Sequence, residues 1–224
     1  MINPIKWLEL ELKRNFTRAI LDTEKNLQNK KRREQKRRQE DRNHLIYYFH
    51  QVDDPYSHLC AQSLPLIEET YDVEIKTFVV PSPTKEAAPE PDLLKSHSLE
   101  DAKIVAPHYG FTFPSVNNLP NDKIIQMAQW AFLYKEDESF ADIIKIGELL
   151  WNDDQSSIEH MFSEPLHEEI LDNTLLKNSK LRKSFGHYLG GVFVYEGECY
   201  LGIDRLSLLE KRLANLGAKK DEKA

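Results

Sequence analysis

Residues 45–60 constrain the fold of this chain more than any other stretch. Residues 45–49 are apolar and rich in aromatic side chains, which is typical of a short buried strand. Asp53 or Asp54 can then cap a helix, and Pro55 stands at the first helical position, where its missing N–H costs nothing. The N–H groups at such a helix start favour negative charge. The stretch therefore predicts a central strand followed by a candidate active-site loop.

The next segment completes a βαβ unit. Residues 56–70 have the pattern of a helix, and Pro65 is expected to kink it. Residues 72–80 alternate between polar and apolar and then become wholly apolar, which predicts a second strand. A strand, a helix and a second strand imply a parallel pair joined by a right-handed crossover.

A proline-rich loop at 81–91 is followed by a long helical region without a strand pattern. Asn121 is a good cap for one of its helices. The pattern predicts helices at 99–109, from 121 onward, and at 140–151, 156–162, 164–171 and 174–185. We therefore expect an all-α insertion.

Strand character returns near the end of the chain. Residues 191–195 and 198–201 flank Glu196-Gly197, which favours a hairpin, and Asp204 can cap a last helix over 205–216. This order predicts an α/β protein with a thioredoxin-like fold interrupted by an all-α insertion. The predicted domains are 1–43, a basic helical extension; 44–81 with 188–218, the thioredoxin-like domain; and 92–187, the helical insertion.

The first 43 residues differ in charge from the remainder. They hold 13 Lys and Arg against 7 Asp and Glu, whereas the remainder holds 17 against 30. An apolar stripe at 4–28 predicts an amphipathic helix, and residues 30–42 are a basic arm for RNA, anionic lipid or an acidic partner. Alternatively, the arm is a solvated helix extension whose stripe docks on its own domain or on a second subunit. Nucleic acid binding elsewhere is not expected from so acidic a body.

The chain lacks the marks of several other classes. No apolar run approaches the roughly 20 residues that span a bilayer, and charged residues interrupt the N-terminal apolar ones, so we expect a cytoplasmic protein. Two cysteines and no His-Glu-x-x-His spacing predict no metal site. His50 and His58 flank the opening motif, either as a proton shuttle near Asp54 or as histidines satisfied by solvent.

Three segments carry a resemblance to a known family. The sequence Tyr-Tyr-Phe-His-Gln-Val-Asp-Asp-Pro-Tyr-Ser at 47–57 resembles the opening segment of the DsbA-like superfamily, in its kappa-class glutathione transferase and 2-hydroxychromene-2-carboxylate isomerase branch. Residues 193–198 and 202–206 resemble that branch's closing hairpin and helix start. Residues 100–103, 110–114 and Asn117 resemble its helical insertion. The resemblance covers about residues 44–216.

The resemblance implies a glutathione-dependent isomerase or transferase that acts on a small hydrophobic or aromatic substrate. It also implies a homodimer. The site residues that it implies are catalytic Asp54 and Ser57, with Tyr56, Asn117, Gly191, Val192, Asp204 and Arg205 as ligand-binding residues.

Two departures from the family pattern leave alternatives open. Asp54 stands where the family has a serine that faces the glutathione thiol, and Gly191 stands where it has a cis-proline. An ionised Asp cannot donate to a thiolate, and we expect the helix N-terminus to lower the pKa of Asp54. A non-catalytic binding or regulatory relative is therefore the alternative. A thiol–disulfide oxidoreductase is disfavoured, because residues 54–57 lack Cys-x-x-Cys and Cys60 has the pattern of a packed cysteine.

Overall fold

The computed structural model describes residues 23–114, 119–135, 139–152, 155–162 and 165–221. The chain divides into two compact units, 1–43 and 44–224. The second unit contains, in chain order, β1 (Leu45–His50), α3 (Pro55–Gln62), α4 (Leu64–Thr70), β2 (Glu74–Val79), α5 (Pro91–Val105), η1 (Ala106–Tyr109), α6 (Asp122–Lys135), α7 (Phe140–Leu150), η2 (Gln155–Met161), α8 (Glu168–Ser184), β3 (Val192–Tyr195), β4 (Glu198–Leu201), η3 (Ile203–Arg205) and α9 (Leu206–Asn215).

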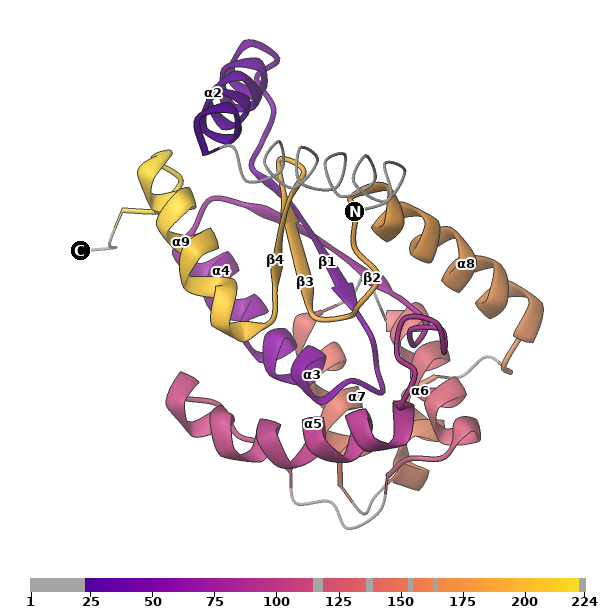
Figure 1. Cartoon of the computed structure of the whole chain (residues 1–224). Helices are drawn as coiled ribbons and strands as arrows, with labels where there is room; N and C mark the ends of the chain where they lie inside the picture. Colours follow the sequence, from indigo (N-terminus) through magenta and orange to yellow (C-terminus); the bar gives the residue numbers. More distant parts are fainter. Residues whose placement is uncertain (1–22, 115–118, 136–138, 153–154, 163–164, 222–224) are drawn as a thin grey trace, which may run out of the picture. The chain divides into compact units, whose positions relative to one another are not determined.

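The four strands of this unit form one mixed sheet in the order β2-β1-β3-β4 (Figure 1). β1 and β2 are parallel, with Leu45 opposite Glu74, as the βαβ pattern predicts. β3 pairs antiparallel with both β1 and β4. Glu196 and Gly197 join β3 to β4 with φ angles of 48° and 72°, and positive φ at both residues is what a tight hairpin requires.

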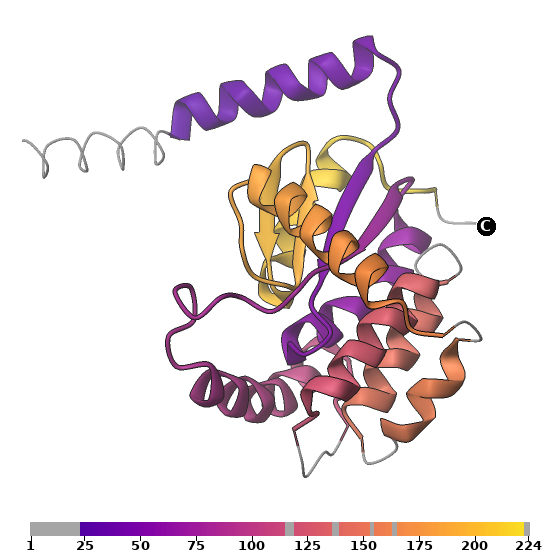
Figure 2. The ribbon, with the colours of Figure 1, turned by 90° about the vertical axis from the view of Figure 1, so that its right-hand side faces the viewer.

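The alternation of side chains along the strands divides the core into two layers. On one face Tyr48 and Phe193 lie with rings 4.8 Å apart and join the large apolar cluster that includes residues of α3, α4, α7 and α9. On the other face Phe49 and its neighbours pack against Leu181 and Phe185 at the end of α8. Figure 2 shows α8 crossing this second face. Helices therefore cover both faces of the sheet, which explains why every side chain of β3 is buried.

Several element boundaries differ from those predicted by sequence. The predicted kinked helix over 56–70 is two helices, because the first ends with Ser63 as its C-cap before Pro65 enters the next. The helix predicted from Leu99 starts earlier, because α5 begins at Pro91, directly after the predicted proline-rich loop. The predicted helices at 164–171 and 174–185 are wrong, because residues 168–184 form the single helix α8.

The last helix also starts differently. A 3₁₀ turn covers residues 203–205, and α9 begins at Leu206 without a side-chain cap. The prediction that Asp204 caps this helix is therefore wrong. The helix is instead fixed through Arg212, which forms an ion pair with Glu198 and places its guanidinium 4.9 Å from the ring centre of Tyr195. This joins α9 to the β3–β4 hairpin.

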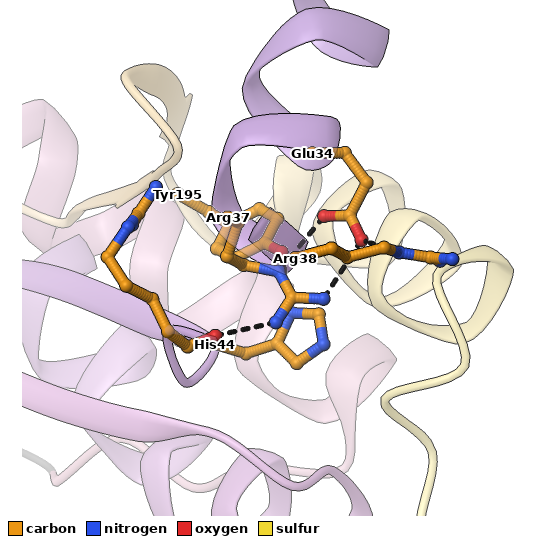
Figure 3. Close-up of polar contacts among 6 residues, drawn as sticks. Glu34, Arg37, Arg38, His44 and Tyr195 are labelled. Carbon is orange, nitrogen blue, oxygen red and sulfur yellow. Dashed lines mark hydrogen bonds and ion pairs between the residues drawn. The ribbon is translucent and has the colours of Figure 1, made fainter. Parts of the chain in front are cut away.

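The first unit is described from residue 23 onward, so most of the predicted amphipathic helix over 4–28 lies outside the described residues. Within it, α2 (Thr23–Gln39) is almost entirely polar. Figure 3 shows Glu34 accepting hydrogen bonds from Arg37 and Arg38, one turn further along the helix. These bonds lower the pKa of Glu34 to about 2. Such i,i+3 and i,i+4 pairs stabilise a helix that has no apolar face.

No helix within the described ranges is both long enough and apolar enough to traverse a bilayer.

Candidate functional site

A cleft of about 620 Å³ lies where the β1–α3 loop, α5 and the start of η3 meet. Its surface is mostly apolar, with a few polar groups set into it. The residues that line it are Gln51, Asp53, Asp54, Pro55, Tyr56, Ser82, Pro83, Lys85, Ala88, Pro91, Leu94, Lys95, Ser98, Asp101, Val105, Tyr109, Leu189, Gly190, Leu201, Gly202, Ile203 and Asp204. A concave, largely apolar site with convergent polar groups is typical of small-molecule binding.

Asp54 caps α3 and lines this cleft. Its carboxylate accepts hydrogen bonds from the N–H groups of Tyr56, at 3.3 Å, and Ser57, at 3.0 Å, as predicted from the Asp-Pro pair. The Ser57 hydroxyl donates a third bond, at 2.7 Å, to Oδ2. Each carboxylate oxygen has two lone pairs, so Oδ1 can still accept one more donor or proton from the cleft.

The expected lowering of the Asp54 pKa is wrong. Loss of solvent at the buried loop raises its pKa to about 6, and neighbouring Asp53 adds to the rise, although the bonds from Ser57 and Tyr56 oppose it. Desolvation of the charged form therefore outweighs the favourable helix N-terminus. A carboxyl with a pKa near 6 can exchange a proton at neutral pH, which suits a general acid or base.

Ser57 lies behind Asp54, away from the cleft surface. It is fully buried, and its hydroxyl accepts a hydrogen bond from the Gln51 N–H at 3.3 Å while it donates to Asp54. Its single donor is thus already used. The structure brings Asp54 and Ser57 together, but in this arrangement Ser57 positions the Asp54 carboxylate.

Gly191 lies against the same loop. Its φ of +61° belongs to the left-handed region, and a Cβ there would lie 3.4 Å from Ser57 Oγ and 3.6 Å from Asp54 Oδ2. Its carbonyl accepts hydrogen bonds from the Gly202 N–H at 2.8 Å and from the Cys60 thiol at 3.8 Å. The two positions that depart from the family pattern, 54 and 191, are therefore neighbours in space.

Asp53 is the centre of a second polar cluster, which the sequence did not single out as a site. Its side chain is 2% exposed and accepts hydrogen bonds from Gln51 Nε2 at 3.1 Å and from Ser82 Oγ at 2.7 and 2.8 Å. Lys95 of α5 completes the cluster, with Nζ 3.2 Å from Asp53 Oδ2. A buried carboxylate with this many partners is well compensated, and it connects the loop to α5.

Tyr56 and Asp101 form another connection between α3 and α5. The Tyr56 hydroxyl donates to Asp101 Oδ2 at 2.5 Å. Burial and this carboxylate raise the pKa of Tyr56 well above its ordinary value, so the phenol stays protonated. Tyr56 therefore faces the cleft as a neutral aromatic group.

The other predicted site residues are spread more widely. Asp204 lines the rim of the cleft, where its exposed carboxylate lies 3.8 Å from Arg205 Nε. Val192 is fully buried in β3, and Arg205 is exposed outside the residues that line the cleft. Asn117 lies outside the described residues.

His50 and His58 are both buried, so the view that solvent satisfies them is wrong. Burial lowers the pKa of His50 to about 3 and that of His58 to about 4. His50 lies 3.0 Å from the Tyr48 hydroxyl and stacks on Phe132. His58 packs against Gly147 of α7, and its Nδ1 has no hydrogen-bond partner among the described residues. Neither histidine lines the cleft, so neither is placed as a proton shuttle for it.

The cleft residues that sequence reasoning missed come mainly from α5. Lys95 and Asp101 lie on its inner side, and Pro91 at its first turn was the available signal for an earlier helix start. In the described ranges no three His, Cys, Asp or Glu side chains are grouped so as to hold a metal ion.

Comparison with known proteins identifies the fold. No protein-family model matches the chain, and no curated protein matches it. A solved structure of 2-hydroxychromene-2-carboxylate isomerase matches with a TM-score of 0.54 and 18% sequence identity, over 77% of this chain and 96% of the isomerase. The match agrees with the mixed four-stranded sheet and its helical insertion. The chain therefore has the DsbA-like thioredoxin fold of this isomerase structure.

Proposed function

We propose that the cleft is the active site of a glutathione-dependent isomerase or transferase that acts on a small hydrophobic or aromatic molecule. The observation that carries the proposal is the position of Asp54, whose carboxyl lines an apolar cleft and has a pKa of about 6. Isomerisation moves protons within a substrate, and a group that can be protonated or ionised near pH 7 serves both steps. The fold shared with 2-hydroxychromene-2-carboxylate isomerase supports the reaction type.

In this proposal Asp54 exchanges the proton and does not stabilise a thiolate. Its one unused lone pair, on Oδ1, accepts a proton from the substrate, and the bonds from Tyr56 and Ser57 hold the carboxylate in place. Glutathione would lie in the cleft beside Gly190, since Gly191 itself packs behind the cleft surface against Ser57 and Asp54. Asp204 at the rim would accept from its ammonium group.

The test is an isomerase assay with 2-hydroxychromene-2-carboxylate, with and without glutathione, together with calorimetric titration of glutathione. We expect turnover that requires glutathione and that Asp54→Asn lowers by at least about a hundredfold. Asp204→Asn is the matched control, since it makes the same change at the exposed rim, and it should alter KM more than kcat. Turnover by Asp54→Asn at the wild-type rate would refute the role of Asp54.

A second candidate is a non-catalytic binding protein. It is favoured by one observation: the Ser57 hydroxyl already donates to the Asp54 carboxylate, so this hydroxyl cannot donate to a thiolate in the cleft. In this case glutathione gives no heat with the wild-type protein, and Asp54→Ser, which keeps a capping side chain, creates binding. Glutathione binding by the wild-type protein that Asp54→Ser leaves unchanged would dismiss this candidate.

We further propose that the protein is cytoplasmic and that it forms a homodimer. Glutathione chemistry fits a reducing compartment, and Cys60 and Cys199 are both free thiols. Sedimentation equilibrium of the full chain tests the assembly, and a mass of about one chain over the micromolar range would contradict it.

A further inference from the structure

A second cavity adjoins the cleft on the far side of the Asp53 cluster. This polar hollow, of about 480 Å³, is lined by Asp53, Ser82, Lys95, Asp122, Lys123, Ile125, Gln126 and Gln129. Asp53, Ser82 and Lys95 line both cavities. The lining of the hollow is mostly polar, whereas that of the cleft is mostly apolar. Two adjoining cavities of opposite character suit one ligand that has an apolar body and a polar head group.

Gln129 provides independent evidence for a ligand. The residue is 8% exposed, lies on α6 and lines the hollow. Its side-chain amide makes no hydrogen bond to any residue that the structure describes, although an amide offers two donors and one acceptor. The amide is not among the fully buried side-chain atoms that lack a partner, so it is open to the hollow that the residue lines. A ligand with both a donor and an acceptor would satisfy it from inside the hollow.

Lys95 can also serve a ligand. Its ammonium carries three donors, of which Asp53 receives one, and its side chain is 34% exposed. Asp53, in contrast, is nearly inaccessible and already holds Gln51, Ser82 and Lys95. Lys95 therefore keeps donors for an anionic group in the hollow, while Asp53 fixes its position.

The charges around the hollow are balanced. Lys95 and Lys123 are opposed by Asp53 and Asp122, the last of which lies in the first turn of α6. A head group that is only an anion or only a cation would leave either the aspartates or the lysines without an opposite charge. A zwitterionic head group places its carboxylate toward the lysines and its ammonium toward Asp122 and the Gln129 amide oxygen.

From these features we propose that the polar hollow binds the α-amino-acid group of a ligand whose apolar or aromatic side chain occupies the cleft. This inference rests on the proposed function, because it assigns a substrate class to the same cleft. The substrate is thus an aromatic or apolar amino acid or a molecule that carries such a head group. Gln129 and Lys95 determine this specificity.

The test compares three compounds by calorimetric titration of the full-length protein at pH 7.5. L-Phenylalanine carries both charges, 3-phenylpropionate lacks the ammonium group and 2-phenylethylamine lacks the carboxylate. We expect L-phenylalanine to bind at least about tenfold more tightly than each of the others, since each loses one charged hydrogen bond. This series uses only the wild-type protein, so it does not depend on how any variant folds.

Two substitutions then locate the head group. Gln129→Leu replaces the amide by an apolar group of similar volume, and Lys95→Met removes the ammonium but keeps the stem. Lys95→Met removes the partner of the carboxylate, so it should abolish most of the preference over 2-phenylethylamine. Gln129→Leu removes an acceptor for the ammonium group, so it should abolish most of the preference over 3-phenylpropionate. Lys103→Met is the matched control on α5, because Lys103 lines neither cavity, and it should keep the preference.

The outcomes separate this inference from the proposed function. Equal binding of the three compounds, or a preference that survives both substitutions, overturns the amino-acid head group but leaves the cleft as a ligand site. Binding of none of the three also overturns it. A glutathione titration of the same protein then decides whether the proposed function survives, because heat with glutathione supports the cleft and its absence shows that both have failed.

Discussion

The unusual pKa of Asp54 has a measurable consequence for stability. The carboxyl has a pKa of about 6 in the folded protein and an ordinary value of 3.8. Between these two values the folded protein keeps a proton that the unfolded chain has lost, so the contribution of Asp54 to stability falls as pH rises. Replacing Asp54 with Asn removes this dependence and keeps a residue that caps helices well.

The magnitude follows from the shift. A shift of about two units corresponds to a penalty of about 3 kcal/mol at neutral pH, because each unit is worth about 1.4 kcal/mol. About 2 kcal/mol of that penalty develops between pH 4.5 and 7.5. The difference in unfolding free energy between Asp54→Asn and the wild type should therefore grow by about 2 kcal/mol in favour of the variant over this range.

The variant must be compared with the wild type, because other groups change the unfolding free energy of the wild type with pH in the opposite direction. His50 and His58 have pKa values of about 3 and about 4, below their ordinary 6.5, so the unfolded chain binds protons first as pH falls. Their contribution to stability rises with pH in the same window. Both proteins keep these histidines, and their effect cancels in the comparison.

The assay is urea denaturation followed by circular dichroism at half-unit steps from pH 4.5 to 7.5. Asp204→Asn is the control, because it makes the same substitution at an exposed carboxyl on the rim of the cleft. The reasoning is refuted if the Asp54→Asn difference stays constant within about 0.5 kcal/mol, or if Asp204→Asn gives a change of equal size.

Three further substitutions test the packing. A Cβ on Gly147 would lie 2.1 Å from His58 Nδ1, so Gly147→Ala should lower the unfolding free energy by about 1–3 kcal/mol. In a His58→Ala background the same substitution should be neutral or stabilising. An equal loss of stability in both backgrounds would contradict this contact. Arg212→Met should cost about 2 kcal/mol by urea denaturation, since its carboxylate and ring partners on the β3–β4 hairpin lose their cation, and a loss below about 0.5 kcal/mol would count against that role. Burial raises the pKa of the Cys60 thiol well above its ordinary value, so a thiol reagent should modify Cys60 only after unfolding. Modification of the native protein that disappears in Cys60→Ala but persists in Cys199→Ala would show instead that Cys60 is accessible.

Local patterns were sufficient to predict the strands and the cap of α3. The apolar run that begins at Leu45, the Asp-Pro pair and the Glu196-Gly197 turn each depend on residues close together in the chain, and the structure contains all three features. The overall class, a thioredoxin-like sheet with a helical insertion, followed from the order of these elements and is confirmed by the structural match.

The electrostatics of the site could not be predicted in the same way. At position 54 the helix N-terminus is visible in the sequence, but the burial that raises the pKa depends on α5 and the 189–191 segment, which are distant in the chain. Lys95 was missed for a similar reason, because its partner Asp53 is known only once α5 is placed against the β1–α3 loop. The pKa of Asp54 and the ion pair of Lys95 both depend on segments that are distant in the chain, so neither could be predicted from local sequence patterns.

The backbone at Gly191 has a consequence for how this site can change during evolution. Proline requires a φ near −65°, whereas Gly191 has a φ of +61°, so a single Gly191→Pro substitution would demand a different loop conformation. The carbonyl of the same residue also holds the Gly202 N–H, so that the segment leading into α9 would move with it. A proline at this position would therefore lower stability unless the loop and the segment before α9 changed as well. The backbone at position 191 and the loop that holds Asp54 can therefore change only together.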